Sequence, residues 1–155
     1  MAVAVALVSL GVALASLLLG DPAADRAERA RDSALQAARE RTTTLTSYDH
    51  RRLDEDFAAV LETATGEFRT EYEKTTGQLK QTFVQQRAVA VAEVVAAGLE
   101  EADVDGEGAD TATAVVAVDQ VIKTAGQPAR TERNRLRMEL VRPDGTWLVQ
   151  RVERL

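Results

Sequence analysis

The spacing of apolar residues changes twice along this chain and divides it into three parts. Residues 2–20 form a continuous apolar run, residues 42–85 carry apolar side chains at intervals of three and four, and residues 87–155 carry them mostly at alternate positions. Intervals of three and four place side chains on one face of a helix, whereas alternation places them on one face of a strand. The pattern predicts a helical N-terminal half and a sheet-forming C-terminal half.

Two amphipathic helices are predicted in the middle of the chain. Their apolar stripes comprise Leu53, Phe57, Val60, Leu61 and Ala64 in the first helix, and Phe68, Tyr72, Leu79 and Phe83 in the second. Residues 54–56 are acidic, which suits the positive end of a helix dipole. Gly66 follows the first stripe, at a position where the backbone often has positive φ. Both stripes need a surface to bury against, and the predicted sheet supplies one.

The apolar run at residues 2–20 has the length of a membrane span and contains no charged residue. Its 19 residues would rise about 28 Å as a helix, close to the roughly 30 Å hydrocarbon core of a bilayer. A cleaved signal peptide ending near Ala15 is the alternative. However, no Lys or Arg precedes the run, and apolar residues continue through Leu19. We therefore expect a retained, single-pass transmembrane helix at residues 1–20.

Residues 21–46 predict a juxtamembrane helix. Asp21 can cap it, with Pro22 at its first position. A thin seam of small residues runs along it, comprising Ala23, Ala27, Ala30, Ala34, Ala37, Ala38 and Leu45. The favoured interpretation is a solvated helix whose last turns pack on the following domain. The alternative, a contact seam for a partner helix, rests on alanine spacing alone.

The rest of the chain predicts about four antiparallel strands. Residues 87–103 mix helix-forming Ala with alternating Val, and Gly98 favours the strand. Residues 111–124 are rich in β-branched side chains and are apolar on both faces, as in a central strand. Residues 131–142 alternate between an apolar and a charged face. The helices and strands together predict an α+β fold, with helices packed on a curled antiparallel sheet.

The last strand follows a tight turn at residues 143–145, Pro-Asp-Gly. Its apolar alternation breaks near residues 150–151, which predicts a bulge. Aromatic residues make up only 4% of the chain. Each one therefore carries a large share of the apolar burial, and we expect Trp147 and Phe57 to lie in one core.

Two segments resemble a known family. They are LTSYDHRRLDEDFAAVLETATGEFRTEY at residues 45–72 and PDGTWLVQRVERL at residues 143–155. Both are similar to the Mce-associated membrane proteins of actinobacteria, and the similarity covers nearly the whole chain. The motifs TSYD, TGEFR and DGTW are the most specific parts, and none is a catalytic signature. The resemblance implies a nuclear-transport-factor-2-like, cone-shaped domain at residues 47–155.

The same resemblance implies a function and an orientation. It implies a non-catalytic, membrane-anchored accessory or stabilising subunit of an Mce-type lipid import complex, with lipid-binding and permease proteins as partners. The positive-inside rule alone would keep the domain in the cytoplasm, because five Arg follow the apolar run within residues 26–41 and none precedes it. The resembled family instead has a charged cytoplasmic tail and an external domain. We therefore expect a missing tail and an extracytoplasmic domain in the cell membrane.

Composition excludes several classes of function. The net charge of -6 argues against nucleic acid as a partner, because binding to the phosphate backbone needs a basic face. The chain has no Cys, which rules out disulfides, thiolate catalysis and Cys-bound metals. Arg greatly outnumbers Lys, a bias typical of GC-rich genomes and consistent with an actinobacterial source.

Candidate sites for chemistry are few. Tyr48, Asp49 and His50 are adjacent and could include a base and its orienter. Adjacent turn residues rarely face each other, however, so we expect Asp49 to cap a helix instead. Asp119, on the central strand, could be a buried base or a solvated strand residue. The nucleotide-binding and common hydrolase motifs are absent.

Two charged segments have ligand-binding alternatives. Acidic residues at 103–110 lack the spacing and late Glu of a calcium loop, so a solvated hairpin tip is favoured. The ladder of Arg133, Arg135 and Arg137 could bind phosphate or anionic lipid, but Glu132 and Glu139 nearby favour a solvated face. We predict no catalytic, cofactor-binding or metal-binding residue, no cofactor and no small-molecule substrate.

Two other functions fit the same architecture. One is an assembly component of a type IV secretion or conjugation machine, which also combines a single span with a cone-shaped domain. The other is an orphan cone-fold enzyme or small-molecule binder. Fold alone cannot separate these functions.

Overall fold

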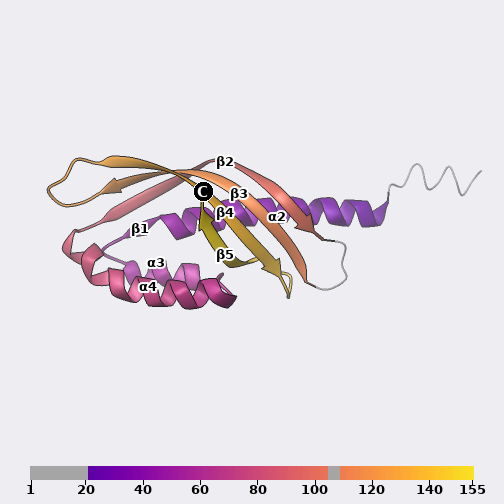
Figure 1. The fold of residues 1–155 in the computed structure, drawn as a ribbon, viewed down its shortest axis with the longest axis horizontal. Helices are drawn as coiled ribbons and strands as arrows, with labels where there is room; N and C mark the ends of the chain where they lie inside the picture. Colours follow the sequence, from indigo (N-terminus) through magenta and orange to yellow (C-terminus); the bar gives the residue numbers. More distant parts are fainter. Residues whose placement is uncertain (1–20, 105–108) are drawn as a thin grey trace, which may run out of the picture.

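The computed structural model describes residues 21–104 and 109–155. Its elements in chain order are α2 (Pro22–Thr46), β1 (Tyr48–Asp49), α3 (Leu53–Leu61), α4 (Gly66–Gln85), β2 (Val89–Asp103), β3 (Asp110–Lys123), β4 (Arg130–Arg142) and β5 (Leu148–Arg154). The three helices pack on one side of a curled, half-barrel sheet of five strands (Figure 1). The predicted α+β class and layering are confirmed.

The sheet has one strand more than the four expected. The additional strand is β1, which pairs antiparallel with β2 so that Tyr48 lies opposite Ala90. Two residues carry no readable alternation, so the apolar pattern could not reveal this strand. The strand order is β1-β2-β3-β4-β5, and each neighbouring pair is antiparallel.

Three extra residues interrupt the regular pairing. Val95 and Glu100 are unmatched on β2 opposite β3, and Gln150 is unmatched on β5 opposite β4. Such bulges increase the local twist of a sheet and bend the bulged strand. The bulge predicted near residues 150–151 is confirmed.

Helix α2 begins as predicted and then packs on the sheet. The Asp21 carboxylate accepts a hydrogen bond from the Ala23 N–H at 2.9 Å, and Pro22 stands in the first turn. The buried side chains along α2 are Ala30, Ala34, Ala37, Ala38 and Thr42. Four of these, the alanines, belong to the same core cluster as buried strand residues. The part of the alanine seam from Ala30 to Ala38 is therefore covered by the chain's own sheet, while Ala23 is exposed.

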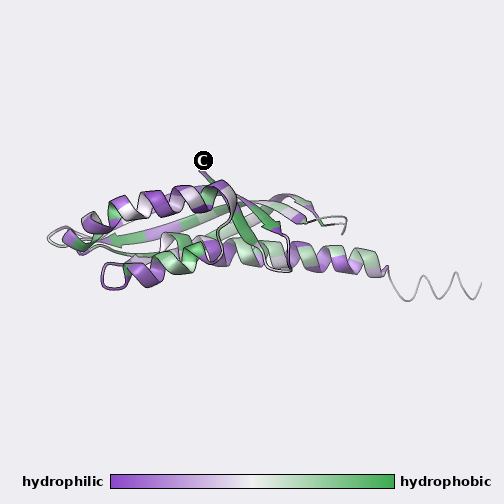
Figure 2. Cartoon of the chain, turned by 90° about the horizontal axis from the view of Figure 1, so that it is seen from below, coloured by the Kyte–Doolittle hydropathy of each residue, from purple (hydrophilic) through white to green (hydrophobic). Residues whose placement is uncertain are grey.

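The main core is built from small and aliphatic side chains around a single large one. Val116, Met138, Leu140 and Trp147 are buried in it with the alanines of α2. Figure 2, which looks at the helical side, shows apolar strand segments behind the helices. The predicted burial of Trp147 is confirmed. The prediction that Trp147 and Phe57 lie in one core is wrong, because Phe57 lies outside this cluster and is only half-buried.

The junction between α3 and α4 pairs with β5. The Thr65 N–H donates to the Val149 carbonyl at 2.8 Å, and the Val149 N–H donates to the Thr63 carbonyl at 2.7 Å. Gly66 has φ +57, so the predicted positive φ is confirmed. The TGEFR junction and the strand that follows the DGTW turn are therefore neighbours in space.

The predicted span at residues 2–20 and the tip of the acidic hairpin, residues 105–108, lie outside the described residues. Within residues 21–104 and 109–155, no helix is both long enough and apolar enough to cross a membrane. The same two ranges contain no group of three or more His, Asp or Glu side chains that could hold a metal ion.

Candidate functional site

The TSYD motif, at residues 46–49, ties the end of α2 to the sheet. The Thr46 carbonyl accepts a hydrogen bond from Gln120 Nε2 at 2.6 Å, and the Ser47 hydroxyl accepts one from the Ala92 N–H at 3.2 Å. The last carbonyls of a helix have no partner inside the helix, and the contact from Gln120 satisfies the one at Thr46. The motif therefore has a structural role in this fold.

Asp49 organises the turn before α3. Its carboxylate accepts hydrogen bonds from the Arg51 N–H at 3.0 Å and from Arg51 Nε at 2.9 Å. Its own N–H donates to Asp56 Oδ2 at 2.7 Å. The hydrogen bonds from Arg51 hold the pKa of Asp49 well below its usual range. The expectation that Asp49 caps α3 is wrong, because the N-cap position belongs to Arg52.

The side chains of Asp49 and His50 lie near each other but are not joined by a hydrogen bond in the structure. His50 Nδ1 lies 3.5 Å from Asp49 Oδ1, and this buried nitrogen makes no hydrogen bond in the described part of the chain. The Asp49 carboxylate is already engaged by Arg51. A general base needs a direct hydrogen bond, or one bridging water, to its partner. The hydrogen bonds of Asp49 to Arg51 and Asp56 fix the turn before α3.

Asp119 and the arginine ladder lie on the outer face of the sheet. The Asp119 carboxylate is 3.8 Å from Arg133 Nε, and its side chain is 39% exposed. Arg137 Nε lies 2.8 Å from Glu100 Oε2. Of the two roles considered for Asp119, the structure shows the solvated strand residue.

Five of the six aromatic residues form a second cluster, which touches the main core through Phe68. We call Tyr48, Phe57, Phe68, Tyr72 and Phe83 the aromatic cluster. Tyr48 stacks on Phe83 with ring centres 4.7 Å apart, and Phe57 meets the edge of Tyr72 at 6.2 Å. Stacked and edge-to-face pairs each add about 0.5–1.5 kcal/mol beyond burial. The cluster joins β1, α3 and α4.

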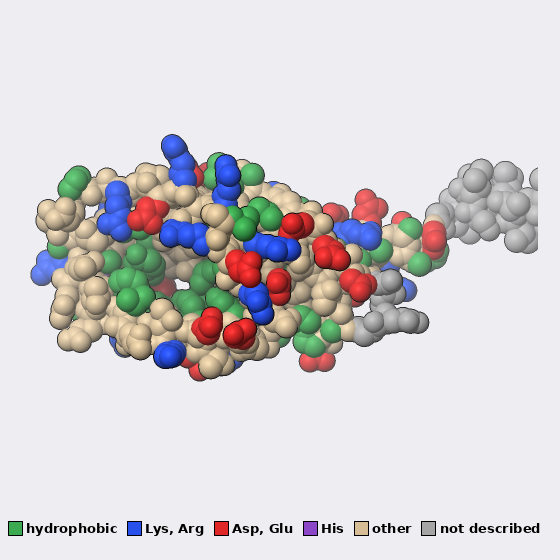
Figure 3. Space-filling model, viewed as in Figure 1, with side chains coloured by type: hydrophobic (Ala, Val, Ile, Leu, Met, Phe, Trp, Pro, Cys, Tyr) green, Lys and Arg blue, Asp and Glu red, His purple; other side chains and the backbone are tan. Residues whose placement is uncertain are grey.

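The side chains of the aromatic cluster are partly accessible to solvent. All five rings are half-buried, and Figure 3 shows a hollow between the sheet and the helices with apolar side chains at its base. Burial raises the pKa of Tyr48, opposed by Arg130 and assisted by Glu132, both on β4. Burial and then Asp56 raise the pKa of Tyr72 to about 12. An apolar base with a charged rim is the composition of a protein-docking surface.

Sequence reasoning placed four of these rings on helix stripes but did not bring them together. Phe57, Phe68, Tyr72 and Phe83 were expected to pack on the sheet. Phe68 does pack against the core that lies on the sheet, and all four rings also contact one another or Tyr48, whose two-residue strand the apolar pattern did not predict. The sequence feature that pointed to such a cluster was the scarcity of aromatic residues in the rest of the chain.

A sequence profile described as "Uncharacterized protein Rv1363c/MT1408-like" matches residues 1–155. The chain belongs to this family. The Rv1363c/MT1408-like family is mycobacterial, in agreement with the expected actinobacterial source. No curated protein matches the chain. The family description names no Mce complex, so that part of the resemblance is not shown.

Solved structures share the fold of this Rv1363c/MT1408-like chain. The periplasmic domain of DotI matches with a TM-score of 0.68 at 13% identity, covering 80% of this chain and 94% of that one. An IcmL-like type IV secretion system protein from Legionella pneumophila matches with a TM-score of 0.65 at 12% identity, covering 81% and 91%. CagV, a VirB8 homologue from the type IV secretion system of Helicobacter pylori, matches at 0.55 and 12%, covering 79% and 96%. At these identities the likeness shows the fold alone.

Proposed function

We propose that this chain is a non-catalytic assembly subunit of a multi-protein complex in the cell envelope. Residues 2–20 anchor it to the membrane, and the cone domain lies on the extracytoplasmic side. The observation that carries the proposal is the likeness of about four-fifths of the chain to domains named as periplasmic or as type IV secretion components. Subunits of this kind act by holding other proteins.

The geometry of the candidate site supports docking over turnover. The aromatic cluster offers half-buried rings to a neighbouring chain, and aromatic side chains are enriched at protein interfaces. Arg130 and Glu132 at its rim are paired at 3.0 Å and can exchange this contact for one with a partner. Asp49 is committed to Arg51 and leaves His50 without an orienter.

Two kinds of complex compete for this subunit, and the fold favours the first. A secretion or conjugation machine is supported by the folds of the IcmL-like protein and CagV. An Mce-type lipid importer, the second candidate, is favoured by the segments at residues 45–72 and 143–155. These segments resemble Mce-associated membrane proteins, and they meet where Thr65 and Val149 share a hydrogen bond.

Purification of the tagged full-length chain from membranes, after cross-linking in cells, tests the proposal. Recovery of secretion ATPase or channel subunits supports the first complex, and recovery of lipid-binding and permease subunits supports the second. A tagged single-span protein without the cone domain is the control. If the tagged chain brings down no more proteins than this control does, the proposal fails.

The location of the domain has its own test. Because the chain has no native Cys, single cysteines at the exposed positions Glu62 and Gln78 report the side of the membrane. We expect an impermeant maleimide to label both in intact cells. Labelling only after lysis would place the domain in the cytoplasm. Recovery of the full-length chain in the soluble fraction after alkaline carbonate extraction would exclude the anchor.

A further inference from the structure

The outer face of the sheet carries opposite charges on its two sides. Carboxylates lie along β2 at Glu93, Glu100 and Glu101, and guanidinium groups lie along β4 at Arg133, Arg135 and Arg137. The register confirms that these rows share one face, since Glu93 is opposite Asp119, which is opposite Arg133. Strand β3 runs between the two rows.

The same face has a protrusion on one side of β3 and a hollow on the other. Val95 is the unmatched bulge residue of β2 and is 62% exposed, and Val91, four residues earlier on the same strand, is 64% exposed. Exposed apolar side chains that lie together are typical of interaction sites. The hollow, of about 370 Å³, is lined by Ala117, Asp119, Arg133, Asn134, Arg135 and Leu155.

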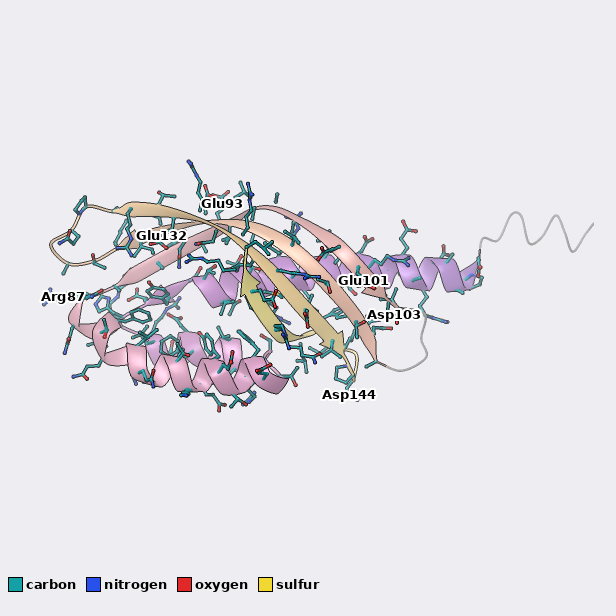
Figure 4. The ribbon with its side chains drawn as sticks, viewed as in Figure 1. Arg87, Glu93, Glu101, Asp103, Glu132 and Asp144 are labelled. Atoms are coloured by element: carbon teal, nitrogen blue, oxygen red, sulfur yellow. The ribbon has the colours of Figure 1, made fainter. Side chains whose placement is uncertain are left out.

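Among the charged residues level with the bulge and the hollow, two make no ion pair within the described part of the chain. Neither Glu93, at the crest of the curved sheet (Figure 4), nor Arg135 makes an ion pair with another described residue. The ladder arginines beside Arg135 differ, because Arg133 is 3.8 Å from Asp119 and Arg137 is 2.8 Å from Glu100. Glu93 and Arg135 therefore remain free to pair with charges on another molecule.

We propose that this outer face docks onto a second copy of the chain, with a two-fold axis along β3. Such an axis exchanges the β2 side of one copy with the β4 side of the other. It places the Val95 bulge of each copy over the hollow of the other. It also brings Glu93 of each copy over the level of Arg133 of the other, with Arg135 two residues further along β4 and within reach of its side chain, twice in each dimer. Packed sheets keep their strands nearly aligned, which this axis allows.

A second copy fits better than an unrelated protein because the surface is complementary to itself. Each feature on the β2 side has its counterpart on the β4 side: a protrusion with a hollow, and an unpaired acid with an unpaired base. An isologous interface requires this reciprocity, whereas a different partner does not. The dimer leaves the aromatic cluster of β1, α3 and α4 free for the assembly partner proposed above.

Cross-linking of the full-length chain in its own membranes tests this interface. Val121, exposed on β3, lies near the proposed axis, so Val121→Cys in the Cys-free chain meets its own copy. A short bis-maleimide should give a covalent dimer. Gln78→Cys, exposed on α4 at the helical side of the sheet, is the matched control and should give none. No dimer at position 121, or equal dimer at both positions, would overturn the proposal.

Exchanging the charges of Glu93 and Arg135 tests whether these two residues pair across the interface. In the Val121→Cys background, Glu93→Arg and Arg135→Glu should each reduce the cross-linked fraction about tenfold, which corresponds to about 1.4 kcal/mol. The two changes together restore opposite charges across the axis and should restore the dimer. Both positions are exposed, and unchanged melting temperatures would show that the variants fold. Failure of the double exchange to restore the dimer would overturn the pairing.

Discussion

The indole N–H of Trp147 donates a hydrogen bond to the Ser33 hydroxyl 3.0 Å away, across 114 residues of sequence. Ser33 in turn donates to the Ala30 carbonyl at 2.8 Å. The Arg142 guanidinium lies over the indole, 4.9 Å from the ring centre, and makes an ion pair with Asp110. The DGTW turn is thus fastened to α2, and α2 is held as part of the domain.

Removal of either side of this contact should destabilise the domain. Trp147→Ala should lower the free energy of unfolding by about 3–5 kcal/mol, the usual effect of truncating a core aromatic. Ser33→Ala should lower it by about 1–3 kcal/mol, because the buried indole N–H loses its acceptor. Urea unfolding followed by circular dichroism measures both, with the exposed neighbour Asp32→Ala as control. Equal midpoints for Ser33→Ala and Asp32→Ala would show that the hydrogen bond adds no stability.

The aromatic cluster should stabilise α4 separately from the main core. Phe83 touches Tyr48 and Phe57, and its loss removes two of the four ring contacts in the cluster. Phe83→Ala should therefore speed amide hydrogen exchange in α4 while the amides of β3 and β4 keep most of their protection. Val84→Ala, at a more exposed position on the same helix, is the matched control and should change little. Uniform loss of protection across the sheet would mean that the two clusters are one cooperative unit.

Stability at high pH should depend on Tyr72. Its pKa in the folded state is about 12, against an ordinary value of 10.0. A raised tyrosine pKa leaves stability intact below about pH 10 and reduces it as pH rises from 10 to 12, because the unfolded chain ionises first. Tyr72→Phe should flatten this decline and leave stability near pH 7 almost unchanged. Identical alkaline profiles for Tyr72→Phe and the native chain would contradict the burial of this phenol.

Helix α4 ends with a residue in a conformation that favours glycine. Arg87, at the opposite end of the sheet from Asp103 (Figure 4), has φ 49 and follows the C-cap residue Gln86. The Ala88 N–H donates to the Phe83 carbonyl at 2.9 Å, completing the bond pattern of a Schellman motif. Arg87→Gly should raise the unfolding free energy by about 1 kcal/mol through relief of this strain. Arg87→Ala keeps the strain and should give no gain, so equal effects of the two variants would exclude this cause.

The sequence predicted those parts of the fold that local chemistry determines. The Asp21 cap, the positive φ at Gly66 and the bulge at Gln150 each follow from a residue type and its immediate neighbours. Strand β1 was missed because pairing of two residues depends on β2, which lies 40 residues further on. The interpretation of the alanine seam also depended on distant residues, since only the placement of the sheet decides what covers Ala34.

The candidate site was less predictable than the fold. Tyr48, Asp49 and His50 were candidates because their side chains can take part in acid–base chemistry. In the structure, the hydrogen bonds of this segment hold a turn and a helix end. The aromatic cluster contains side chains from three elements, and no local sequence pattern predicts that these side chains are in contact. The complementarity between Glu93 and Arg135 likewise requires the register of β2, β3 and β4.

Partner abundance in a deletion strain tests the central claim, that this chain holds other subunits without turnover, most directly. Quantitative mass spectrometry of membranes should show that co-purifying subunits decline when the gene is deleted. Complementation with the native chain or with an Asp49→Asn, His50→Ala variant should restore them equally. Unchanged subunit levels in a deletion strain without a paralogue would contradict the assembly role. Restoration by the native chain alone, with the variant folded and equally abundant, would contradict the non-catalytic role.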